Sequence, residues 1–348
     1  MKKFILENAV RKNILALKPY SCARDEYKGD DAIFLDANEN PFGVLNRYPD
    51  PYQSEVKRKL AQQKRVPEDR IFVGNGSDEV IDLVFRIFCN PGIDKALSFT
   101  PTYGMYKVSA AINDVDMIEI PLREDFRIDL PALIPFFDDE HLKIIFICSP
   151  NNPTGNLMNP GDVKFILNSF SGIVFVDEAY IDFAGVQSLI CETDRYPNLI
   201  VAQTFSKSRA LASARIGLAY SSREIIGYYN KVKAPYNVSG PNQKAALDAL
   251  ADETEFLSRK TAILEEKQRL RNELSGISLI KKIYHSDANF FLVEVGDADR
   301  IYSTLTDMKI VTRNRHSVIK NCIRITVGTP SENTALLEAL QKMEEITV

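Results

Sequence analysis

Short apolar runs alternate with longer helical stretches between about residues 69 and 220 of the chain. The runs are "RIFVGN", "KALSFT", "KIIFICS", "GIVFVDE", "NLIVAQT" and "IGLAYS". They are continuously apolar and rich in Ile, Val and Phe, which is typical of strands that are covered on both faces. Several of them lie about 30 residues apart, the spacing of strand–helix–strand units. The pattern predicts an α/β domain built on a mostly parallel sheet.

The pattern changes after about residue 240. Two helices are predicted for "NQKAALDALAD" and "TEFLSRKTAILEEKQRLRNEL". An apolar run, "NFFLVEV", a helix near residues 298–308, a strand in "NCIRITVG" and a closing helix from Ser331 follow. Because strands and helices are here mixed without a regular alternation, we expect a smaller α+β domain.

The N-terminal residues form a separate stretch. Leu6, Val10, Ile14 and Leu17 lie on one stripe of an amphipathic helix. We therefore divide the chain into an arm of residues 1–30 that packs with the small domain, a large domain of residues 31–240 and a small domain of residues 241–348.

Composition narrows the function classes. The chain has 348 residues, 26% of them charged, and a net charge of −4. Without a basic excess, neither nucleic acid nor an acidic membrane surface is an expected partner. Charged residues from Glu7 onward interrupt the apolar start, so we expect no export signal. The five cysteines are scattered without a CxxC pair, which favours a reducing cytoplasm, and the three histidines lie far apart, so no metal site is expected.

Three of the predicted strands end on residues that carry chemistry. "KIIFICS" runs into "PNNPTG" with Asn152, "GIVFVDE" ends on Asp177 with Tyr180 close behind, and "NLIVAQT" leads to Lys207. In open α/β sheets, ligands bind beyond the carboxyl ends of the strands. Each residue alone has a structural explanation, since "NNPTG" is a turn sequence, Asp177 suits a helix cap and Lys207 can reach solvent. Their shared position favours a common site.

A Gly-rich turn in "FVGNGSDEVIDLVF" adds an anion site to this set. The backbone N–H groups of Gly76, Ser77 and Asp78 are expected at a helix N-terminus, where they favour phosphate. A turn with a Ser cap explains the same residues without a ligand, and neither GxGxxG nor a Walker motif supports a nucleotide. An amine, a carboxylate, a phenol and a phosphate site together suit pyridoxal 5′-phosphate, which needs a lysine for its aldehyde and an anion for its ring nitrogen.

These motifs resemble the fold-type I, aspartate-aminotransferase-like enzymes, over nearly the whole chain from "LKPYSCAR" to "IRITVGT". The resemblance implies a large domain with a mostly parallel seven-stranded sheet in an α/β/α sandwich, plus a smaller α+β domain. It also implies that Lys207 binds the cofactor covalently and that Asp177 pairs with its ring nitrogen. The other cofactor-binding residues that it implies are Gly76, Ser77, Asp78, Tyr103, Asn152, Tyr180, Ser206, Arg215 and, from the second subunit of a homodimer with shared active sites, Tyr48.

Within this group, "LDANENPFG", "RYPDPY", "GNGSDE" and "CIRITVGT" are most similar to the histidinol-phosphate aminotransferases. That resemblance implies L-histidinol phosphate and 2-oxoglutarate as substrates. In "CIRITV", Arg324 lies on the strand face opposite to Ile323 and Ile325. An arginine in this position usually faces solvent, whereas the resemblance implies that it binds an anionic group of the substrate. Tyr20, Asn40 and Arg313 are the further candidates for the substrate side.

Several alternatives stay open. An aromatic or broad-specificity aminotransferase and a phosphothreonine decarboxylase use the same cofactor residues and differ only on the substrate side. A ligand-sensing regulator retains the fold but usually carries a DNA-binding domain. Relatives have an aromatic residue at the position of Arg209 and a glycine at that of Ser213, so the segment after Lys207 departs from the family pattern.

Overall fold

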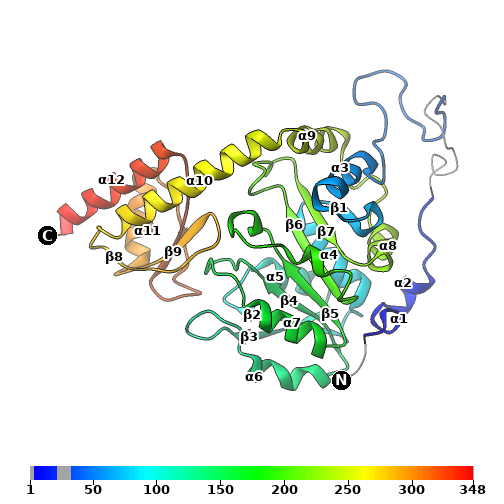
Figure 1. The fold of residues 1–348 in the computed structure, drawn as a ribbon, viewed down its shortest axis with the longest axis horizontal. Coiled ribbons are helices and arrows are strands. Elements are labelled where there is room, and N and C mark those ends of the chain that lie inside the picture. The colour runs from blue at the N-terminus through cyan, green and yellow to red at the C-terminus, as the bar shows by residue number, and fades with distance from the viewer. Residues whose placement is uncertain (1–3, 22–32, 348) are drawn as a thin grey trace.

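The computed structural model describes residues 4–21 and 33–347 and contains two sheets (Figure 1). The first has seven strands in the order β1-β7-β6-β5-β4-β2-β3, and only β7 runs antiparallel to its neighbours. The strands are β1 (Ile71–Asn75), β2 (Lys95–Thr100), β3 (Asp116–Pro121), β4 (Leu142–Cys148), β5 (Ile173–Asp177), β6 (Leu199–Thr204) and β7 (Ile216–Tyr220). The predicted α/β fold with a mostly parallel sheet is confirmed.

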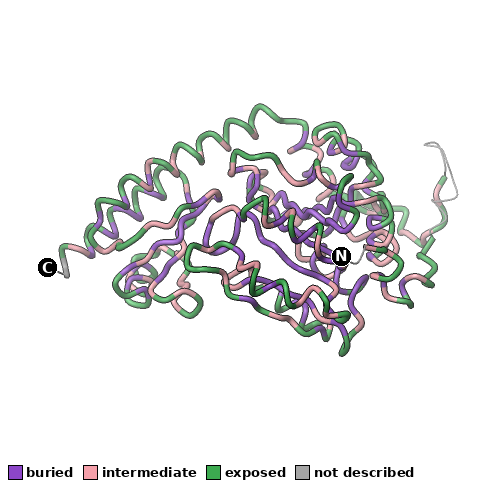
Figure 2. Tube along the Cα trace, turned by 60° about the horizontal axis from the view of Figure 1, so that its bottom comes forward, coloured by how far each residue is buried: buried purple, intermediate pink, exposed green. Residues whose placement is uncertain are grey.

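Helices cover both faces of this sheet because alternate strand residues bury in opposite directions. Ile144 and Phe146 of β4 join one core cluster, and Ile145 and Ile147 join the other. Figure 2 shows the central strands as buried and the outer helix surfaces as exposed. The helices of the large domain are α3 (Ser54–Lys64), α4 (Ser77–Phe88), α5 (Met105–Ile112), α6 (Leu130–Leu133), α7 (Pro160–Ser169), α8 (Arg223–Val232) and α9 (Gly240–Ala251).

The small domain has an antiparallel sheet in the order β10-β11-β9-β8 and its own core. Its strands are β8 (Ile280–Ile283), β9 (Phe290–Val295), β10 (Arg313–Asn314) and β11 (Cys322–Thr326), and its helices are α10 (Glu253–Leu274), α11 (Ala298–Asp307) and α12 (Pro330–Thr347). Helix α10 starts beside the large domain and ends in the small one, and it connects the two (Figure 1).

The boundary between the domains differs from the predicted one. Helix α9 packs on α3, and its residues Ala246 and Leu250 belong to the core of the large domain. The large domain therefore continues to about Asp252, which caps α10 through its side chain. The change of pattern at residue 240 marks the end of the strand–helix alternation, whereas the core extends one helix further.

The N-terminal arm also packs differently from our expectation. It forms two short helices, α1 (Leu6–Ala9) and α2 (Lys12–Ala16). Val10 and Ile14 are buried in the core of the large domain, and Arg11 donates a hydrogen bond from Nη1 to the carbonyl of Arg86 at 2.9 Å. Residues 4–21 thus lie against the large domain rather than the small one, and residues 22–30 lie outside the described part.

Truncating Ile14 tests this packing. Ile14→Ala should lower the free energy of unfolding by about 2 kcal/mol, because it leaves a cavity beside the large-domain core. Leu17→Ala is the matched control, since Leu17 is 40% exposed, and it should change stability by less than about 0.5 kcal/mol. Urea unfolding of both variants measures the difference, and equal effects would contradict the packing.

Candidate active site

A cavity of about 430 Å³ opens at the carboxyl ends of β4, β5 and β6 and faces the small domain. Most of the residues predicted from the sequence line it, which places them in one site. They are Ser77, Asp78, Tyr103, Asn152, Asp177, Tyr180, Ser206, Lys207, Arg215, Arg313 and Arg324. Parallel neighbouring strands bring these residues together, as the position of the motifs at the strand ends predicted.

Lys207 enters the cavity from the turn after β6. The side chain of Thr204, the last residue of β6, accepts a hydrogen bond from the Ser206 N–H at 3.1 Å, which shapes this turn. The Lys207 side chain is partly exposed, and its Nζ lies 5.6 Å from the centre of the Tyr180 ring. Partial burial of the amine and the positive charge of Arg324 lower the pKa of Lys207.

Asp177 is the last residue of β5 and is buried in the floor of the cavity. The Tyr106 hydroxyl donates to its Oδ2 at 2.8 Å, and the Ala179 N–H donates to its Oδ1 at 3.0 Å. Burial raises the pKa of Asp177, while these two hydrogen bonds and the Lys207 charge act in the opposite direction. A buried carboxylate in this position favours a cationic group beside it.

The opposite end of the cavity is formed by the N-terminus of α4. Gly76 has φ +79, and a Cβ atom there would lie 2.6 Å from Arg215 Nη2. Arg215 donates to Asp78 Oδ2 at 3.0 Å, and the Tyr103 hydroxyl donates to Asp78 Oδ1 at 3.1 Å. Gly76 itself does not line the cavity, and its role is to let the backbone and Arg215 approach each other closely. The Gly76 N–H donates to the Arg215 carbonyl at 2.8 Å, so this predicted phosphate donor is engaged within the chain. A helix N-terminus beside a guanidinium is suited to a phosphate.

The small domain forms the side of the cavity that carries three arginines. Arg313 and Arg324 are register partners on β10 and β11, and Arg315 follows β10 directly. Arg324 donates from Nη1 to Asn152 Oδ1, and its guanidinium lies 5.2 Å from the centre of the Phe290 ring. Within residues 4–21 and 33–347, no carboxylate lies within ion-pair distance of any of the three. We call this group the arginine wall.

Comparison of the sequence with known proteins identifies the family of this chain. The aminotransferase class I and II profile matches residues 23–340. The histidinol-phosphate aminotransferase of Cytophaga hutchinsonii is 50% identical over 345 residues, which cover 97% of this chain and 99% of that protein. The chain belongs to the histidinol-phosphate aminotransferases of the class I and II aminotransferase family.

Solved structures of other proteins share the fold of this chain. The histidinol-phosphate aminotransferase from Clostridium acetobutylicum aligns with a TM-score of 0.79 at 26% identity and covers 89% of this chain and 98% of that one. The enzyme from Sinorhizobium meliloti, solved in complex with pyridoxal-5′-phosphate, shares the fold with a TM-score of 0.80 at 23% identity, over 87% of this chain and 84% of that one.

Besides Gly76, three residues that the family resemblance implicates do not line the cavity of this chain. Tyr20 is 68% exposed and lies in a separate small cavity beside Lys233. The Asn40 side chain accepts a hydrogen bond from the Phe42 N–H, and the ring of Tyr48 stacks on Tyr236 at 4.3 Å between ring centres. Their roles toward cofactor and substrate stay predictions.

Two further residues of this aminotransferase site were not expected from the sequence. Tyr106 contacts Asp177 from α5, and Arg315 joins the arginine wall. Tyr103 precedes α5 and Tyr106 lies in its first turn, and their rings meet edge to face with 5.6 Å between the centres. The nearness of Tyr106 to the predicted Tyr103 in "TYGMY" is the sequence signal for Tyr106. Arg315 lies beyond a two-residue strand, so no periodicity points to it.

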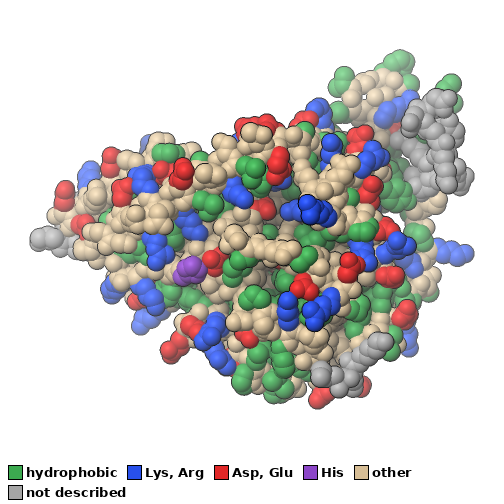
Figure 3. All heavy atoms as spheres, viewed as in Figure 1, with side chains coloured by type: hydrophobic (Ala, Val, Ile, Leu, Met, Phe, Trp, Pro, Cys, Tyr) green, Lys and Arg blue, Asp and Glu red, His purple; other side chains and the backbone are tan. Residues whose placement is uncertain are grey.

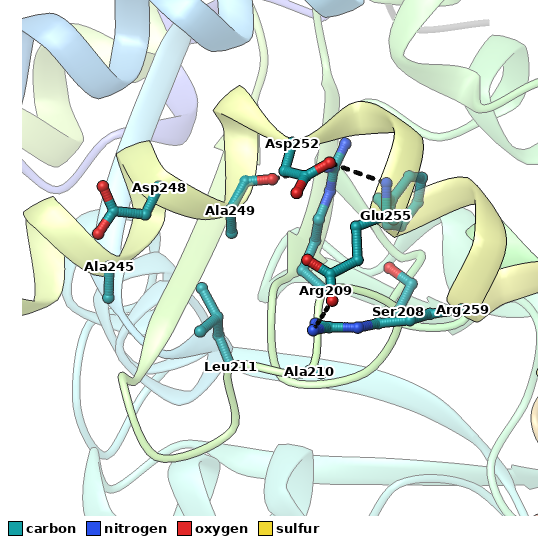
Figure 4. A pocket seen from close by; sticks show the side chains of 11 residues that line it. Ser208, Arg209, Ala210, Leu211, Ala245, Asp248, Ala249, Asp252, Glu255 and Arg259 are labelled. Carbon is teal, nitrogen blue, oxygen red and sulfur yellow. Dashed lines mark hydrogen bonds and ion pairs between the residues drawn. The ribbon is translucent and has the colours of Figure 1, made fainter.

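Arg209, which the family pattern did not lead us to expect, lies at the junction between the domains. It extends from the loop after Lys207 toward the turn between α9 and α10 (Figure 4). Its guanidinium stacks on the Phe256 ring at 3.7 Å, Nη1 donates to the Ala249 carbonyl at 3.0 Å, and Nη2 pairs with Glu253 at 3.0 Å. Arg209 thus ties the lysine loop to the start of α10.

The donor set of the cavity fits pyridoxal 5′-phosphate. Lys207 supplies an amine for the aldehyde, and Asp177 supplies a buried anion for the ring nitrogen. Arg215 and the α4 N-terminus supply a guanidinium and helix N–H donors for the phosphate, and a Cβ at position 76 would displace Arg215 from this place. In the described residues no group of three His, Cys, Asp or Glu side chains is arranged to hold a metal ion.

Replacing Tyr106 tests whether its hydrogen bond to the Asp177 carboxylate lowers the pKa of Asp177. Tyr106→Phe keeps the ring stacked on Phe146 but removes the donor to Asp177, so the pKa of Asp177 should rise further. The carboxylate would then take up a proton at a higher pH, and the acid limb of the kcat profile should move to higher pH. We expect kcat to fall about tenfold, as for the loss of one hydrogen bond to a charged group.

Tyr229→Phe is the control for this prediction. The Tyr229 hydroxyl is equally buried and donates to the Val80 carbonyl at 3.1 Å, outside the cavity. It should leave the pH profile unchanged. An acid limb that stays in place in Tyr106→Phe would contradict the positioning role of Tyr106.

Proposed function

We propose that the protein transfers the amino group of L-histidinol phosphate to 2-oxoglutarate, with pyridoxal 5′-phosphate as cofactor. The products are imidazole acetol phosphate and L-glutamate, and the reaction is a step of histidine biosynthesis. The observation that carries this proposal is the juxtaposition of Lys207 and Asp177 at neighbouring strand ends, opposite the arginine wall. The names of the relatives support the choice of substrate.

The bound cofactor supplies an aldehyde that accepts the amino group and a ring that withdraws electrons from the substrate. Asp177 would accept a hydrogen bond from the ring nitrogen of the bound cofactor and so keep that nitrogen protonated. Lys207 would take the proton from the amine-bearing carbon of the substrate and deliver it to the cofactor carbon that carried the aldehyde. An amine serves as a base only in its neutral form, so the lowered pKa of Lys207 extends its activity toward neutral pH.

The arginine wall explains how one site accepts two different substrates. L-Histidinol phosphate carries a phosphate and no carboxylate, whereas 2-oxoglutarate carries two carboxylates. Guanidinium groups bind both kinds of anion through paired N–H donors. The Asn152 amide oxygen accepts from Arg324 and orients its guanidinium. Each substrate thus places one anionic group on the same wall and its reacting carbon near Lys207.

We further propose a homodimer in which Tyr48 reaches the cofactor phosphate of the other subunit. The segment of residues 33–48 stands out from the large domain and carries apolar side chains on its surface (Figure 3). Ile33, Leu35, Phe42 and Val44 are each more than four-fifths exposed. Apolar patches of this kind mark contacts with other chains. Exposed Ile and Phe side chains on a segment that stands out from its own domain favour a second copy of the chain as the partner that covers them.

We place the reaction in the cytoplasm. Four of the cysteines are described, and all four are free thiols, which agrees with a reducing compartment. None of the described helices combines the length and the apolar character needed to cross a bilayer.

A panel of amino donors tests the proposed function. With 2-oxoglutarate as acceptor, L-histidinol phosphate should give a kcat/KM at least about 100-fold above that of phenylalanine. Phenylalanine carries a carboxylate but neither a phosphate nor an imidazole, so the donors and acceptors that pair with those two groups would stay unpaired. O-Phosphothreonine should release no carbon dioxide. Faster turnover of phenylalanine would support a broad-specificity aminotransferase, and carbon dioxide release would support a decarboxylase.

Mixing two inactive variants tests the shared site. Lys207→Ala lacks the reacting amine, and Tyr48→Phe lacks the hydroxyl that we assign to the partner's phosphate site. After joint unfolding and refolding, mixed dimers should contain one intact site and give about a quarter of wild-type activity, because random pairing makes half of the dimers mixed. Activity no higher than that of the separate variants would contradict a site shared between subunits.

A further inference from the structure

The lysine loop, residues 205–215, connects β6 to β7 and carries Lys207. Within it, the Ala210 N–H donates to the Lys207 carbonyl at 3.2 Å, and the Leu211 N–H donates to the Phe205 carbonyl at 3.0 Å. Ala210 has φ +56, a left-handed conformation that residues other than glycine rarely adopt. A residue keeps such a conformation only where the surrounding structure imposes it. Contacts from outside the loop must therefore help to hold the backbone at Lys207.

Side chains of the loop make such contacts with other elements. Ser208 donates from Oγ to Asp182, which lies after β5, and Arg215 donates to Asp78 of α4 at 3.0 Å. Both of these partners belong to segments that leave the large sheet. Arg209 differs from both, because it reaches the junction between α9 and α10.

Arg209 binds both helices at this junction. Its Nη1 donates to the carbonyl of Ala249 in the last turn of α9, and its Nη2 pairs with Glu253, the first residue of α10, each at 3.0 Å. Its guanidinium also stacks on the Phe256 ring at 3.7 Å. A planar guanidinium can make these contacts together, whereas an ammonium cannot. Only 9% of the Arg209 side chain is exposed, so water screens its charge little.

A cavity of about 480 Å³ lies between the lysine loop and the two helices (Figure 4). Ala210 and Leu211 of the loop and Ala245 and Asp248 of α9 are among its lining residues. The loop is therefore not close-packed against the helices at this point. Because Arg209 spans this space, its contacts determine where the loop lies relative to α10.

Helix α10 extends this contact to the small domain. It begins beside Arg209, and near its other end Leu270 and Leu274 are buried in the core of the small domain. Lys267 of the same helix donates to the Ser286 carbonyl at 2.7 Å. A helix is a rigid element that carries displacements from one end to the other. A movement of the small domain thus acts on the start of α10 and on Arg209.

We propose that Arg209 is a positioning residue that holds the lysine loop at a fixed place on α10 and so couples the Lys207 amine to the position of the small domain. The described residues that line the active-site cavity do not include Arg209. It therefore acts through the backbone of the loop and not by contact with a substrate. This inference rests on the proposed function, because it takes Lys207 as the reacting amine.

Kinetics of Arg209→Met test this role, since methionine keeps an apolar stem and removes the guanidinium. We expect kcat to fall about tenfold or more, because a small displacement of a catalytic group slows the chemical step. The KM for L-histidinol phosphate should change by less than about threefold. Arg209→Lys retains the charge without the planar group and should lie between.

Arg259→Met is the matched control for this variant. Arg259 lines the same outer cavity, but it pairs with Glu255 of its own helix. Its removal takes away a guanidinium without touching the lysine loop. Both kcat and KM should therefore match the wild type.

Phe256→Leu tests the coupling from the side of α10. Leucine stays apolar but lacks the ring face on which Arg209 stacks, so kcat should fall although the change lies on another element. The double variant with Arg209→Met should be no more than about twofold slower than Arg209→Met alone, because both changes remove the same interaction. Effects that multiply would contradict coupling through this contact.

Hydrogen exchange of the holoenzyme gives a readout that does not depend on turnover. In Arg209→Met, the Ala210 and Leu211 amides should exchange at least about tenfold faster than in the wild type, whereas the amides of β5 should keep their protection. In Arg259→Met both sets should be unchanged. The absorption band of the lysine-bound cofactor counts the intact sites of each variant, and kcat is normalised to it.

The outcomes separate the inference from the function on which it rests. If the wild-type enzyme does not turn over L-histidinol phosphate, the proposed function fails. If it does, the positioning role of Arg209 is wrong when Arg209→Met keeps the wild-type kcat, when KM rises more than kcat falls, or when exchange becomes faster throughout the molecule or only in α9 and α10. A fall in kcat at nearly constant KM, with faster exchange in the lysine loop and protected β5 amides, supports it.

Discussion

The parallel pairing of β4, β5 and β6 is the constraint on which the whole site depends. Cys148 pairs with Asp177 and Asp177 pairs with Ala202, so β4 and β5 end at one level of the sheet and β6 continues from there to Thr204. The segments that follow, with Asn152, Tyr180 and Lys207, must then leave the sheet at the same edge. A shift of one residue in any of these strands would turn its terminal side chain to the other face. The two-sided burial of the strands prevents such a shift, so core packing positions the chemistry.

Charge is distributed along the cavity in a way that suits a ligand with two anionic ends. Arg215 and the N-terminus of α4 lie at one end, and the arginine wall lies at the other. Lys207 and Asp177 lie between them, and the burial of Asp177 gives its charge more effect than it would have in water. Because one end belongs to the large domain and the other to the small one, both domains must hold their positions for a ligand to bind. Arg209, which joins the lysine loop to α10, contributes to this.

Much of this arrangement was predictable because it rests on continuous apolar runs and on motifs at their ends. Each of the six runs became a strand, and the residues that end three of them line the cavity. β3 was missed because it is an edge strand, half exposed, whose sequence "DMIEIP" lacks an apolar run. The boundary at residue 240 was misplaced because an amphipathic helix does not reveal which core it joins, and Ala246 and Leu250 join the larger one. Tyr106 and Arg315 were missed because contacts between distant elements determine their roles.

The central claim is that Lys207 and Asp177 make this cavity an aminotransferase site for a phosphorylated amine. The most direct test is the absorption spectrum of the protein with pyridoxal 5′-phosphate, before and after addition of L-histidinol phosphate and then of 2-oxoglutarate. We predict that the band of the lysine-bound cofactor gives way to that of its aminated form and returns with the second substrate. A lysine-bound band that L-histidinol phosphate leaves unchanged would contradict the claim.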